Sequence, residues 1–514
     1  MVQVVWFKRD LRVHDHAPLS LASVRGPIIA IYVYEPALIM ALDYAAQHLG
    51  FINESLSELD SALQIRGCRL HRFHGDIISI LGQVFIAAPF CDLWSHEETG
   101  NGLSFARDKA VAEWCRSKNI AWHEIPQNGV VRRLSNRNGW AKRWDERMTD
   151  TSTPAPEAIR AAPLTIATCG AKYAGDFRLQ TSDKPNRQLG GRRLAVALLE
   201  SFLNYRGQHY RQAMSSPLTA QSDCSRLSAH LAFGTLSLRE VVQAARARQN
   251  ALRALPKGEA PPGFLASLKS FEGRLHWHCH FIQRLESEPR IEFENLNRGY
   301  DGLREKDFDL EKFGAWTRGE TGYPMVDACM RMLADTGWLN FRMRAMIVSF
   351  ASYHLWLHWR EPALFLAREF LDYEPGIHYS QIQMQSGVTG INTVRIYNPV
   401  KQGRDQDPAG IFVRKWIPAL ANVSDDAIFE PWKMSKAIQL QANCVIGRDY
   451  PAPIVKHEAA ARIAKARVWQ VKHQSDVKSE STRVYQKHGS RKRSARSAPT
   501  DSTLKLTSQL QLDL

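Results

Sequence analysis

Two arginines close an apolar run at residues 337–344 (GWLNFRMR), where Arg342 and Arg344 would lie in an apolar helix. A guanidinium buried among apolar side chains needs a carboxylate partner, because an unpaired buried charge is very unfavourable. Asp372 and Glu374, in the later segment LDYE (371–374), could supply that carboxylate. Such a pair could serve a bound ligand or only the fold, and composition leaves both open.

A phosphate site is the second candidate. Residues 225–228 (SRLS) follow a loop and precede an apolar helical run. Serine hydroxyls, a guanidinium and free backbone N–H groups at a helix start together form a place to hold phosphate. The tetrapeptide alone is weak evidence, because serine is also common at ordinary helix starts.

Histidine pairs at helical spacing are the candidates for metal binding. His276 and His280 are four residues apart, as are His354 and His358. Neither pair has a carboxylate or a third ligand spaced to complete a site, so each is interpreted as a polar helix face and no metal is expected. Seven of the 14 tryptophans lie between Trp277 and Trp432, and aromatic residues at helical spacing usually pack in a core.

The elements that would position these residues begin with an alternation of strands and helices. Short apolar runs predict five strands, at 2–7, 28–34, 69–74, 91–96 and 120–125. Amphipathic stretches near 44–66 and 103–118 predict helices between them. This order predicts an open, mostly parallel α/β sheet covered on both faces. No GxGxxG follows a predicted strand, so an ordinary dinucleotide crevice is not supported there.

Four regions follow from changes in composition. Residues 1–130 are the α/β domain. The periodicity fades over residues 131–195, and residues 151–163 (TSTPAPEAIRAAP) are rich in Pro and Ala, which predicts a connector that runs over the surface. Residues 196–474 show helical periods broken by Gly and Pro, which predicts an all-α domain. Residues 475–514 are basic and rich in Ser and Thr, which predicts a disordered tail.

Charge and composition narrow the partners. Lys and Arg outnumber Asp and Glu by 67 to 52, a net charge of +15. The segment 475–514 has eight Lys and Arg against four acidic residues, so the folded body carries most of the excess. This favours a polyanion such as nucleic acid, although a solvated basic surface gives the same count. With 44% hydrophobic and 23% charged residues, a largely disordered chain is excluded.

Three features that the sequence lacks narrow the predicted cellular location. No run approaches the ~18 apolar residues of a membrane span, so no membrane association is expected. The N-terminus (MVQVVWFKRD) lacks a signal-peptide layout, which predicts the cytoplasm. The eight cysteines are at least 23 residues apart, which excludes CxxC zinc and redox motifs and fits reduced thiols.

Taken together, the motifs resemble the DNA photolyase/cryptochrome family over residues 2 to about 470. They are 4–12 (VVWFKRDLR) with His14 and Asp15, 225–228 (SRLS), Trp316 with 319–327 (GETGYPMVD), 337–344 (GWLNFRMR), 359–361 (WRE), 395–399 (RIYNP) and 430–432 (EPW). The resemblance implies an antenna-type α/β domain, a long connector and an all-α domain that holds a U-shaped FAD below a basic groove for DNA.

The resemblance also implies a cofactor-binding set. It consists of Tyr210, Ser225, Arg226, Leu227, Ser228, His278, Arg344, Asp372, Tyr373 and Glu374. The residues at 225–228 would cradle the FAD diphosphate, with Tyr210 on the loop before them. Arg344 and Asp372 would form the ion pair beside the isoalloxazine ring. Glu374 occupies a position where relatives often have a second Asp, and His278 one where many have an Arg.

The repair chemistry implied by the resemblance is electron donation from photoexcited, fully reduced FAD to a cyclobutane pyrimidine dimer. Trp277 would stack on the flipped lesion, and Arg274, Phe341 and Arg342 would also face DNA. His378 stands where repair enzymes often place an Asn against flavin N5, and it could donate to N5 or accept from N5–H, depending on its tautomer.

This sequence departs from the family pattern around the lesion. Arg274 replaces a Glu that bonds the flipped bases in pyrimidine-dimer photolyases, Phe341 replaces an Asn, and Ala345 replaces a Met. The His pair of (6-4) photolyases is also absent. These changes favour a receptor over a repair enzyme, whereas the basic body and Trp277 favour contact with DNA.

The electron route and the antenna site depart as well. Of the three tryptophans that usually reduce the flavin, only Trp359 matches, with Lys306 and Ile382 at the other two positions. Other aromatic residues that could carry electrons are Trp338, Trp356, Tyr373 and Tyr379. Residues 97–101 (EETGN) lie where a second chromophore of folate or deazaflavin type is expected, but Ser104 replaces the usual folate-contacting Glu, so a sealed pocket is the alternative.

We therefore expect a monomeric, light-driven DNA photolyase (a deoxyribodipyrimidine photo-lyase) that acts on UV-damaged DNA. The alternative is a cryptochrome, a blue-light receptor that binds FAD and DNA without repair. A flavin-binding or DNA-binding protein without photochemistry is the third reading, because fold alone does not determine activity.

Overall fold

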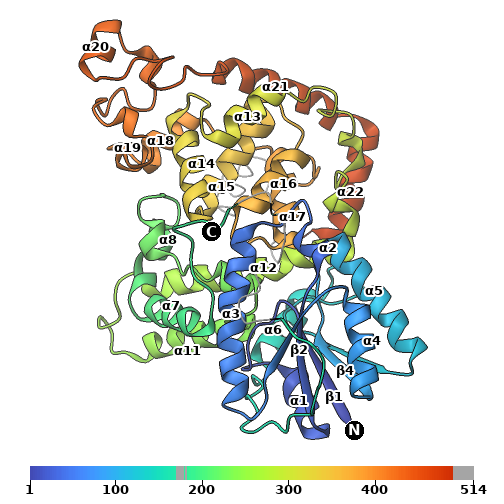
Figure 1. Ribbon diagram of the computed structural model, residues 1–514. Helices are drawn as coiled ribbons and strands as arrows, with labels where there is room; N and C mark the ends of the chain where they lie inside the picture. Colours follow the sequence, from blue (N-terminus) through green and yellow to red (C-terminus); the bar gives the residue numbers. More distant parts are fainter. Residues whose placement is uncertain (170–178, 180–181, 490–514) are drawn as a thin grey trace, which may run out of the picture.

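The computed structural model describes residues 1–169, 179 and 182–489. An α/β domain built on one sheet lies against a larger helical domain (Figure 1). In the described part of the chain, no helix is long and apolar enough to cross a membrane.

Five parallel strands form the sheet in the order β3-β2-β1-β4-β5. Their bounds are Val2–Phe7 (β1), Ile28–Tyr34 (β2), Leu70–His74 (β3), Phe90–His96 (β4) and Ala121–Ile125 (β5). All five predicted strands are confirmed to within one residue at either end. Every residue of β2 is buried, as expected for a central parallel strand with helices on both faces.

Helices cover both faces of this sheet. They are α1 (Ala17–Arg25), α2 (Pro36–Ile39), α3 (Ala46–Gln64), α4 (Ile77–Ala87) and α5 (Gly102–Ser117). Helices α1 and α3 pack in one apolar core and α4 and α5 in another. The predicted helices near 44–66 and 103–118 are confirmed as α3 and α5, whereas α1 and α4 were not predicted.

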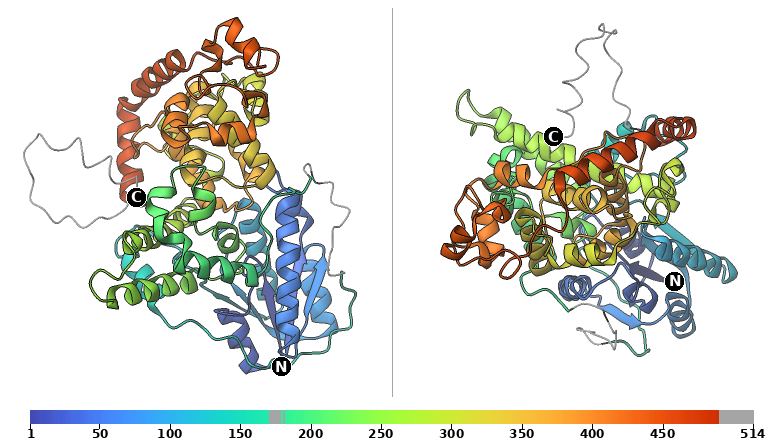
Figure 2. Two further views of the ribbon diagram at one scale, coloured as in Figure 1. Left: turned by 90° about the vertical axis from the view of Figure 1, so that its left-hand side faces the viewer. Right: turned by 90° about the horizontal axis from the view of Figure 1, so that it is seen from above.

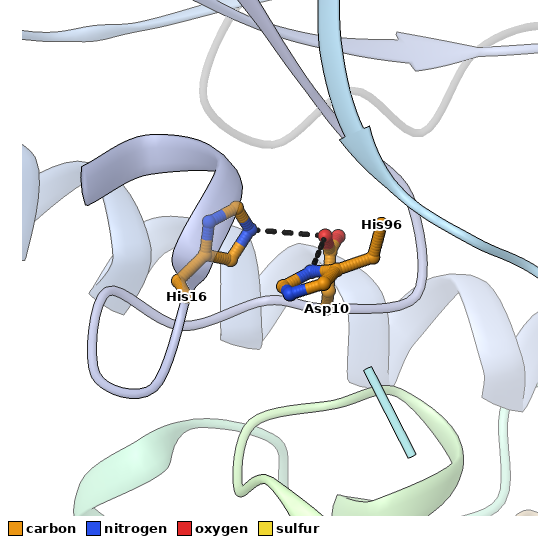
Figure 3. A group of neighbouring side chains, drawn as sticks. All are labelled: Asp10, His16 and His96. Carbon is orange, nitrogen blue, oxygen red and sulfur yellow. Dashed lines mark hydrogen bonds and ion pairs between the residues drawn. The ribbon is translucent and has the colours of Figure 1, made fainter. Parts of the chain in front are cut away.

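A buried polar cluster ties the loop after β1 to the end of β4 (Figure 3). Asp10 Oδ2 lies 2.9 Å from His16 Nε2 and 2.7 Å from His96 Nδ1. His16 Nδ1 accepts from the Leu19 N–H, so His16 Nε2 carries the proton that it donates to Asp10. His16 Nε2 and His96 Nδ1 thus each have a hydrogen bond to the Asp10 carboxylate, and we interpret the cluster as structural.

The connector contains one helix that was not predicted, α6 (Trp140–Thr149). Its Trp140, Trp144 and Met148, four residues apart, pack into a core of the helical domain. The expectation of an irregular segment over the whole of 131–195 was therefore wrong at α6, because three large side chains on one face gain burial against another domain. Residues 170–178 and 180–181 lie outside the described residues.

The second domain is helical, and in the described residues after 191 the structure has no strand. Its elements are α7 (Arg192–Asn204), η1 (Arg206–His209), α8 (Tyr210–Ala213), α9 (Ala220–Asp223), α10 (Ser228–Ala232), α11 (Leu238–Ala254), α12 (Phe264–Ser287), η2 (Pro289–Glu292), η3 (Arg298–Tyr300), α13 (Leu310–Arg318), α14 (Pro324–Thr336), α15 (Phe341–Ser349), the π-helical turn η4 (Phe350–His354), α16 (Arg360–Glu369), α17 (Pro375–Ser386), α18 (Pro399–Gln406), α19 (Ile411–Trp416), η5 (Pro418–Leu420), η6 (Pro431–Lys433), α20 (Lys436–Gln441), α21 (His457–Lys472) and α22 (Ser475–His488).

Helices α12 and α17 cross closely at the centre of this domain. A Cβ on Gly376 would lie 2.5 Å from the Ile282 Cα, so only glycine permits this approach. The close crossing brings the polar face of α12, which carries His278, toward the start of α17, which carries His378.

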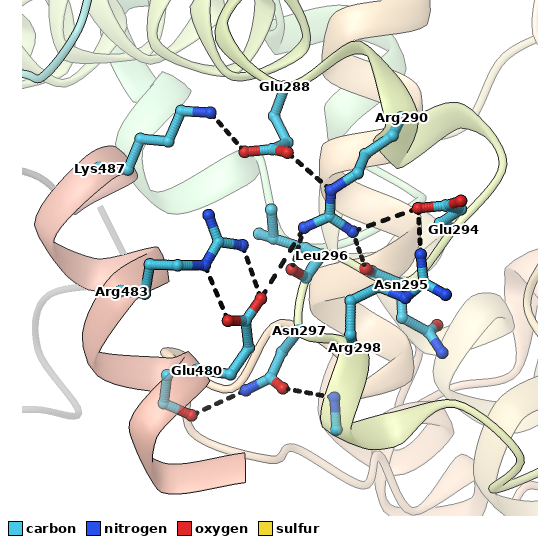
Figure 4. Close-up of polar contacts among 12 residues, drawn as sticks. Glu288, Arg290, Glu294, Asn295, Leu296, Asn297, Arg298, Glu480, Arg483 and Lys487 are labelled. Atoms are coloured by element: carbon cyan, nitrogen blue, oxygen red, sulfur yellow. Dashed lines mark hydrogen bonds and ion pairs between the residues drawn. The ribbon is translucent and has the colours of Figure 1, made fainter. Parts of the chain in front are cut away.

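The last described helix corrects the expectation of disorder from residue 475. Helix α22 runs along the outside of the helical domain, away from the sheet (Figure 2). Val477 and Val484, seven residues apart on one face, are fully buried. Lys487 Nζ lies 2.6 Å from Glu288 Oε2 (Figure 4). Asn297 Nδ2 donates to the Val477 carbonyl at 3.1 Å. Polar composition predicted disorder, but two valines and charges matched to the 288–298 segment hold residues 475–488 in place. Residues 490–514 lie outside the described residues.

Candidate functional site

A cavity of about 350 Å³ lies in the helical domain, where α12, α15, α17 and the segment before α10 meet. The predicted site residues that line it are Tyr210, Ser225, Arg226, Leu227, Ser228, Arg274, Trp277, His278, Phe341, Arg342, Arg344, Asp372, Tyr373, Glu374 and His378. These residues come from five separate stretches of the chain. Only Trp359, among the predicted site residues, is not in the lining.

The predicted ion pair between Arg344 and Asp372 is present at this cavity. Both Arg344 Nη atoms donate to the two Asp372 oxygens at 2.9 Å, and Arg344 Nε donates to the Leu339 carbonyl at 2.8 Å. Burial alone would raise the pKa of Asp372, but the charge and hydrogen bonds of Arg344 and a bond from Ser228 outweigh it and hold the pKa below its usual value. Asp372 therefore remains ionised and fixes the guanidinium at the cavity wall.

Glu374, the other carboxylate considered for Arg344, lies instead 3.5 Å from Arg9 of the N-terminal domain. Burial raises the pKa of Glu374. The positive charge of Arg9 opposes this rise, and the negative charge of Glu98 adds to it. Arg9 also donates to the Tyr373 carbonyl at 2.7 Å. The two carboxylates of the 371–374 segment therefore differ in role, one holding Arg344 and the other facing the domain junction.

Arg226 is the cation of the predicted phosphate segment. Its φ of +61° is in the left-handed region, and its guanidinium lies 3.8 Å from the Trp338 ring centroid. In the described part of the chain no carboxylate forms an ion pair with it, and burial lowers its pKa to about 10. A partly buried cation without an ion-pair partner, beside the hydroxyls of Ser225 and Ser228, suits an anionic group such as a diphosphate.

His278 presents a second unsatisfied group to the same cavity. Its Nδ1 is buried without a hydrogen-bond partner in the described residues, and burial, with a smaller effect from Arg9, lowers the pKa of His278 to about 4. The neutral ring can therefore offer one hydrogen bond to a ligand. Together with Arg226 and the Arg344–Asp372 pair, it fits an elongated ligand that has an anionic middle and polar ring systems, as FAD has.

His378 has a defined tautomer. Its Nε2 lies 2.8 Å from the Ala363 carbonyl, which only accepts, so Nε2 carries the proton. Burial lowers the pKa of His378 to about 4, despite the favourable backbone bond, and the ring is neutral at pH 7. Nδ1 is then a hydrogen-bond acceptor, which removes the alternative in which this nitrogen donates.

The cavity reaches the surface beside an aromatic and cationic rim. Phe341 lines the cavity and is 38% exposed, and the Arg274 guanidinium lies 5.3 Å from its ring centroid. Trp277 packs nearly parallel to Phe281, with ring centroids 5.6 Å apart. Arg342 lines the same region. Flat rings and cations at an opening are groups that contact nucleic-acid bases and phosphates.

Trp359 lies behind this cavity. It is fully buried, and its Nε1 donates to Asn295 Oδ1 at 2.7 Å. Its ring centroid is 6.5 Å from that of Tyr379, which is in turn 6.5 Å from that of Tyr373. Of the other aromatic residues considered for electron transfer, Trp338 and Tyr373 line the cavity, whereas Trp356 does not.

A second cavity of about 110 Å³ lies in the N-terminal domain. Glu98, Gly100 and Asn101 of the predicted chromophore segment line it, as does Ser104. An ionic network borders it, in which Arg107 contacts Glu35 at 3.0 Å and Glu98 at 2.7 Å. Sequence reasoning did not single out Asp43, which also lines this cavity, because its segment carries no motif.

In the described residues, neither histidine pair belongs to a group of three or more side chains that could hold a metal ion. The Trp140 ring packs edge-on against both His276 and His280, which supports the interpretation as a helix face. Among described residues, the one group whose geometry could hold a cation is the hydrogen-bonded Asp10 cluster of Figure 3.

Arg395 and Tyr397 of the RIYNP motif also line the larger cavity, and that motif was the signal for them.

Comparisons with known proteins agree with this geometry. Residues 3–153 match the family model for DNA photolyase, and residues 271–470 match the one for the FAD binding domain of DNA photolyase. The chain is 30% identical over 492 residues to a deoxyribodipyrimidine photo-lyase of Streptomyces griseus, covering 91% of this chain and 99% of that protein. It is 27% identical to cryptochrome DASH of Gloeobacter violaceus, covering 88% and 92%.

A solved structure extends the agreement to the fold. The crystal structure of a bacterial class III photolyase from Agrobacterium tumefaciens superposes with a TM-score of 0.79 at 26% identity, covering 92% of this chain and 98% of that one. FAD is the cofactor of the matched helical domain. With both domains matched and the cavity residues suited to a flavin dinucleotide, the chain belongs to the DNA photolyase and cryptochrome family.

Proposed function

We propose that this protein is a monomeric, light-driven DNA photolyase that repairs UV-induced pyrimidine dimers. Fully reduced FAD, when bound, supplies on absorbing light the electron that splits the cyclobutane ring. The observation that carries the proposal is the cavity itself. It extends from the residues suited to FAD to a surface rim that contains Trp277, Phe341 and two arginines.

One group of residues around the cavity binds the cofactor, and a second group positions the DNA lesion. Arg226 and the hydroxyls of Ser225 and Ser228 bind the diphosphate, and Arg344, fixed by Asp372, orients the flavin ring. Trp277 stacks on the flipped lesion, while Arg274 and Arg342 bind acceptor atoms of the bases or the flanking phosphates. The net charge of +15 supports binding to a polyanion.

His378 sets the protonation of the cofactor in this proposal. Because its Nε2–H is bound to the Ala363 carbonyl, the remaining Nδ1 accepts a hydrogen bond. An acceptor beside flavin N5 favours the N5–H form, whereas the Asn of many relatives can also donate. We propose that the second cavity, at Asn101 and Ser104, holds an antenna chromophore.

The test uses purified protein whose FAD has been chemically reduced. It is mixed with single-stranded DNA that contains a cyclobutane thymine dimer and is illuminated with blue light, and restored thymines are measured by chromatography. A dark sample and a Trp277→Ala variant are the controls. Light-dependent repair supports the proposal, and full FAD reduction without any repair would refute it.

A cryptochrome-type receptor is the second candidate, favoured by one observation. At the cavity mouth the Arg274 guanidinium lies over Phe341, so a cation and a ring occupy the face where relatives that repair dimers have a carboxylate and an amide. Helix α22, docked on the outside of the helical domain, offers such a receptor an output element. The same experiment decides between them, because a receptor with fully reduced FAD leaves the dimer intact under blue light.

A further inference from the structure

Tyr373 forms the wall between the two cavities. Its side chain lines both the cavity of the helical domain and the smaller one of the N-terminal domain, and it is buried. Its hydroxyl donates to Asp43 Oδ2 at 2.6 Å, a short bond between the two domains. Tyr373 is thus a phenol at the larger cavity whose O–H is hydrogen-bonded to a carboxylate. The proposed repair reaction does not use this arrangement.

Asp43 is placed to accept a proton. It is buried, and Asn101 Nδ2 also donates to its Oδ2, at 2.9 Å. Both groups around Oδ2 are donors, so this oxygen is the acceptor in each bond. Burial and the neighbouring Tyr379 and Asp43 raise the pKa of Tyr373 well above its usual value, so the phenol keeps its proton in the resting protein.

A line of aromatic rings leads from Tyr373 into the helical domain. Its hydroxyl lies 3.4 Å from that of Tyr379, and the Tyr379 ring is 6.5 Å from Trp359. Ile382, at one of the positions where the family has tryptophan, lines the cavity without offering an oxidisable ring. In the described residues, Tyr373 is therefore the member of this line that reaches the cofactor cavity.

We propose that Tyr373 is the residue that donates an electron to photoexcited, oxidised FAD, and that Asp43 takes the phenolic proton in the same step. One electron leaves the phenol for the flavin, and the O–H proton moves along the hydrogen bond from Tyr373 Oη to Asp43 Oδ2, whose oxygen atoms lie 2.6 Å apart. The products at this pair are a neutral tyrosyl radical and a neutral carboxylic acid. An external thiolate then returns one electron to the tyrosyl radical and becomes a thiyl radical, and Asp43 returns the proton.

Burial is the reason for the proton transfer. An oxidised phenol that kept its proton would be a buried, strongly acidic cation, and the bonded Asp43 carboxylate is the base that can take that proton. Moving the proton to a bonded carboxylate avoids that cation, and a short, preformed hydrogen bond requires no rearrangement. A tryptophan at position 373 could lose its proton in this way only if an acceptor faced its indole N–H.

The inference rests on FAD binding and not on repair. Oxidised FAD must be reduced by light in a photolyase and in a cryptochrome alike, so the inference holds for either proposed function. A failure of repair would therefore leave it untouched, and its own failure would leave repair by chemically reduced protein untouched.

The experiment compares Tyr373→Phe and Asp43→Asn with the unchanged protein, each loaded with oxidised FAD in a thiol buffer. Tyr450→Phe is the matched control, because Tyr450 also donates to a buried carboxylate, Asp327 Oδ2 at 2.5 Å, but lines neither cavity. FAD content and circular dichroism are measured first. The readouts are flavin absorbance under blue light, a transient tyrosyl radical by electron paramagnetic resonance, and the rate in D₂O.

In the unchanged protein and in Tyr450→Phe we expect a tyrosyl signal and slower photoreduction in D₂O. Tyr373→Phe should lose the signal and photoreduce at least about tenfold more slowly. Asp43→Asn keeps the phenol, but it should also photoreduce more slowly, because an amide is a far weaker base than a carboxylate. If Tyr373→Phe retains FAD and photoreduces at the normal rate, the proposal is wrong. If that variant loses FAD, an unchanged rate and radical yield in Asp43→Asn would refute it.

Discussion

Removing the carboxylate of Asp372 is the perturbation whose size the structure predicts most directly. Arg344 donates two bonds of 2.9 Å to Asp372, whose side chain is only 7% exposed, whereas that of Arg344 is 24% exposed. Removing one partner of a buried pair costs about 3–5 kcal/mol. Because solvent reaches part of Arg344, we expect Asp372→Ala to lower the free energy of unfolding by about 2–3 kcal/mol.

A graded series tests that reasoning. Asp372→Asn keeps one acceptor for Arg344, so it should cost about 1.5 kcal/mol, the value of one charge-assisted hydrogen bond. Asp405→Ala is the control, because it removes an exposed ion pair with Lys401 and should change stability by less than about 0.5 kcal/mol. Bound FAD should fall in the order unchanged protein, Asn variant, Ala variant.

The assay is urea unfolding of the FAD-free protein followed by tryptophan fluorescence, together with FAD absorbance of the purified holoprotein. Measuring the FAD-free chain separates the stability of the pair from any stabilisation by the ligand. The reasoning fails if Asp372→Ala unfolds at the same urea concentration as Asp405→Ala and retains a full complement of FAD.

Three further predictions follow. Trp277→Ala should weaken binding of dimer-containing DNA by ~1–3 kcal/mol in fluorescence anisotropy, whereas unchanged affinity would make Trp277 a packing residue. The pKa of His378 is lowered from 6.5 to about 4, so the unfolded chain binds the proton first. Stability should therefore fall as the pH drops from about 6.5 to about 4, and His378→Asn should weaken that fall in unfolding experiments at several pH values; an identical pH profile would contradict it. Val484→Ala should destabilise the docking of α22 by about 1.5 kcal/mol and speed hydrogen exchange at residues 475–488 alone, and unchanged exchange would mean that polar contacts hold the helix.

Local patterns account for the parts of the fold that were predicted. The β-strands were located because buried parallel strands are short continuous apolar runs, as in Ile28–Tyr34. Helix α6 was missed because its three large side chains, at Trp140, Trp144 and Met148, stand in a segment that otherwise has no apolar period. Helix α22 was missed because its two buried valines are few among polar residues, and their value depends on the surface that they meet.

The sequence by itself determined the family, the two-domain division and the residue types around the larger cavity, because motifs such as SRLS and GWLNFRMR keep their order along the chain. The residue types alone left Asp372 and Glu374 open as partners of Arg344, and the family resemblance favoured Asp372. The tertiary structure shows that pair and places Glu374 against Arg9 instead. It also decided the tautomer of His378, through the Ala363 carbonyl. The bond from Tyr373 to Asp43 joins residues 330 positions apart, and no local pattern encodes such a contact, because it arises where the two domains pack.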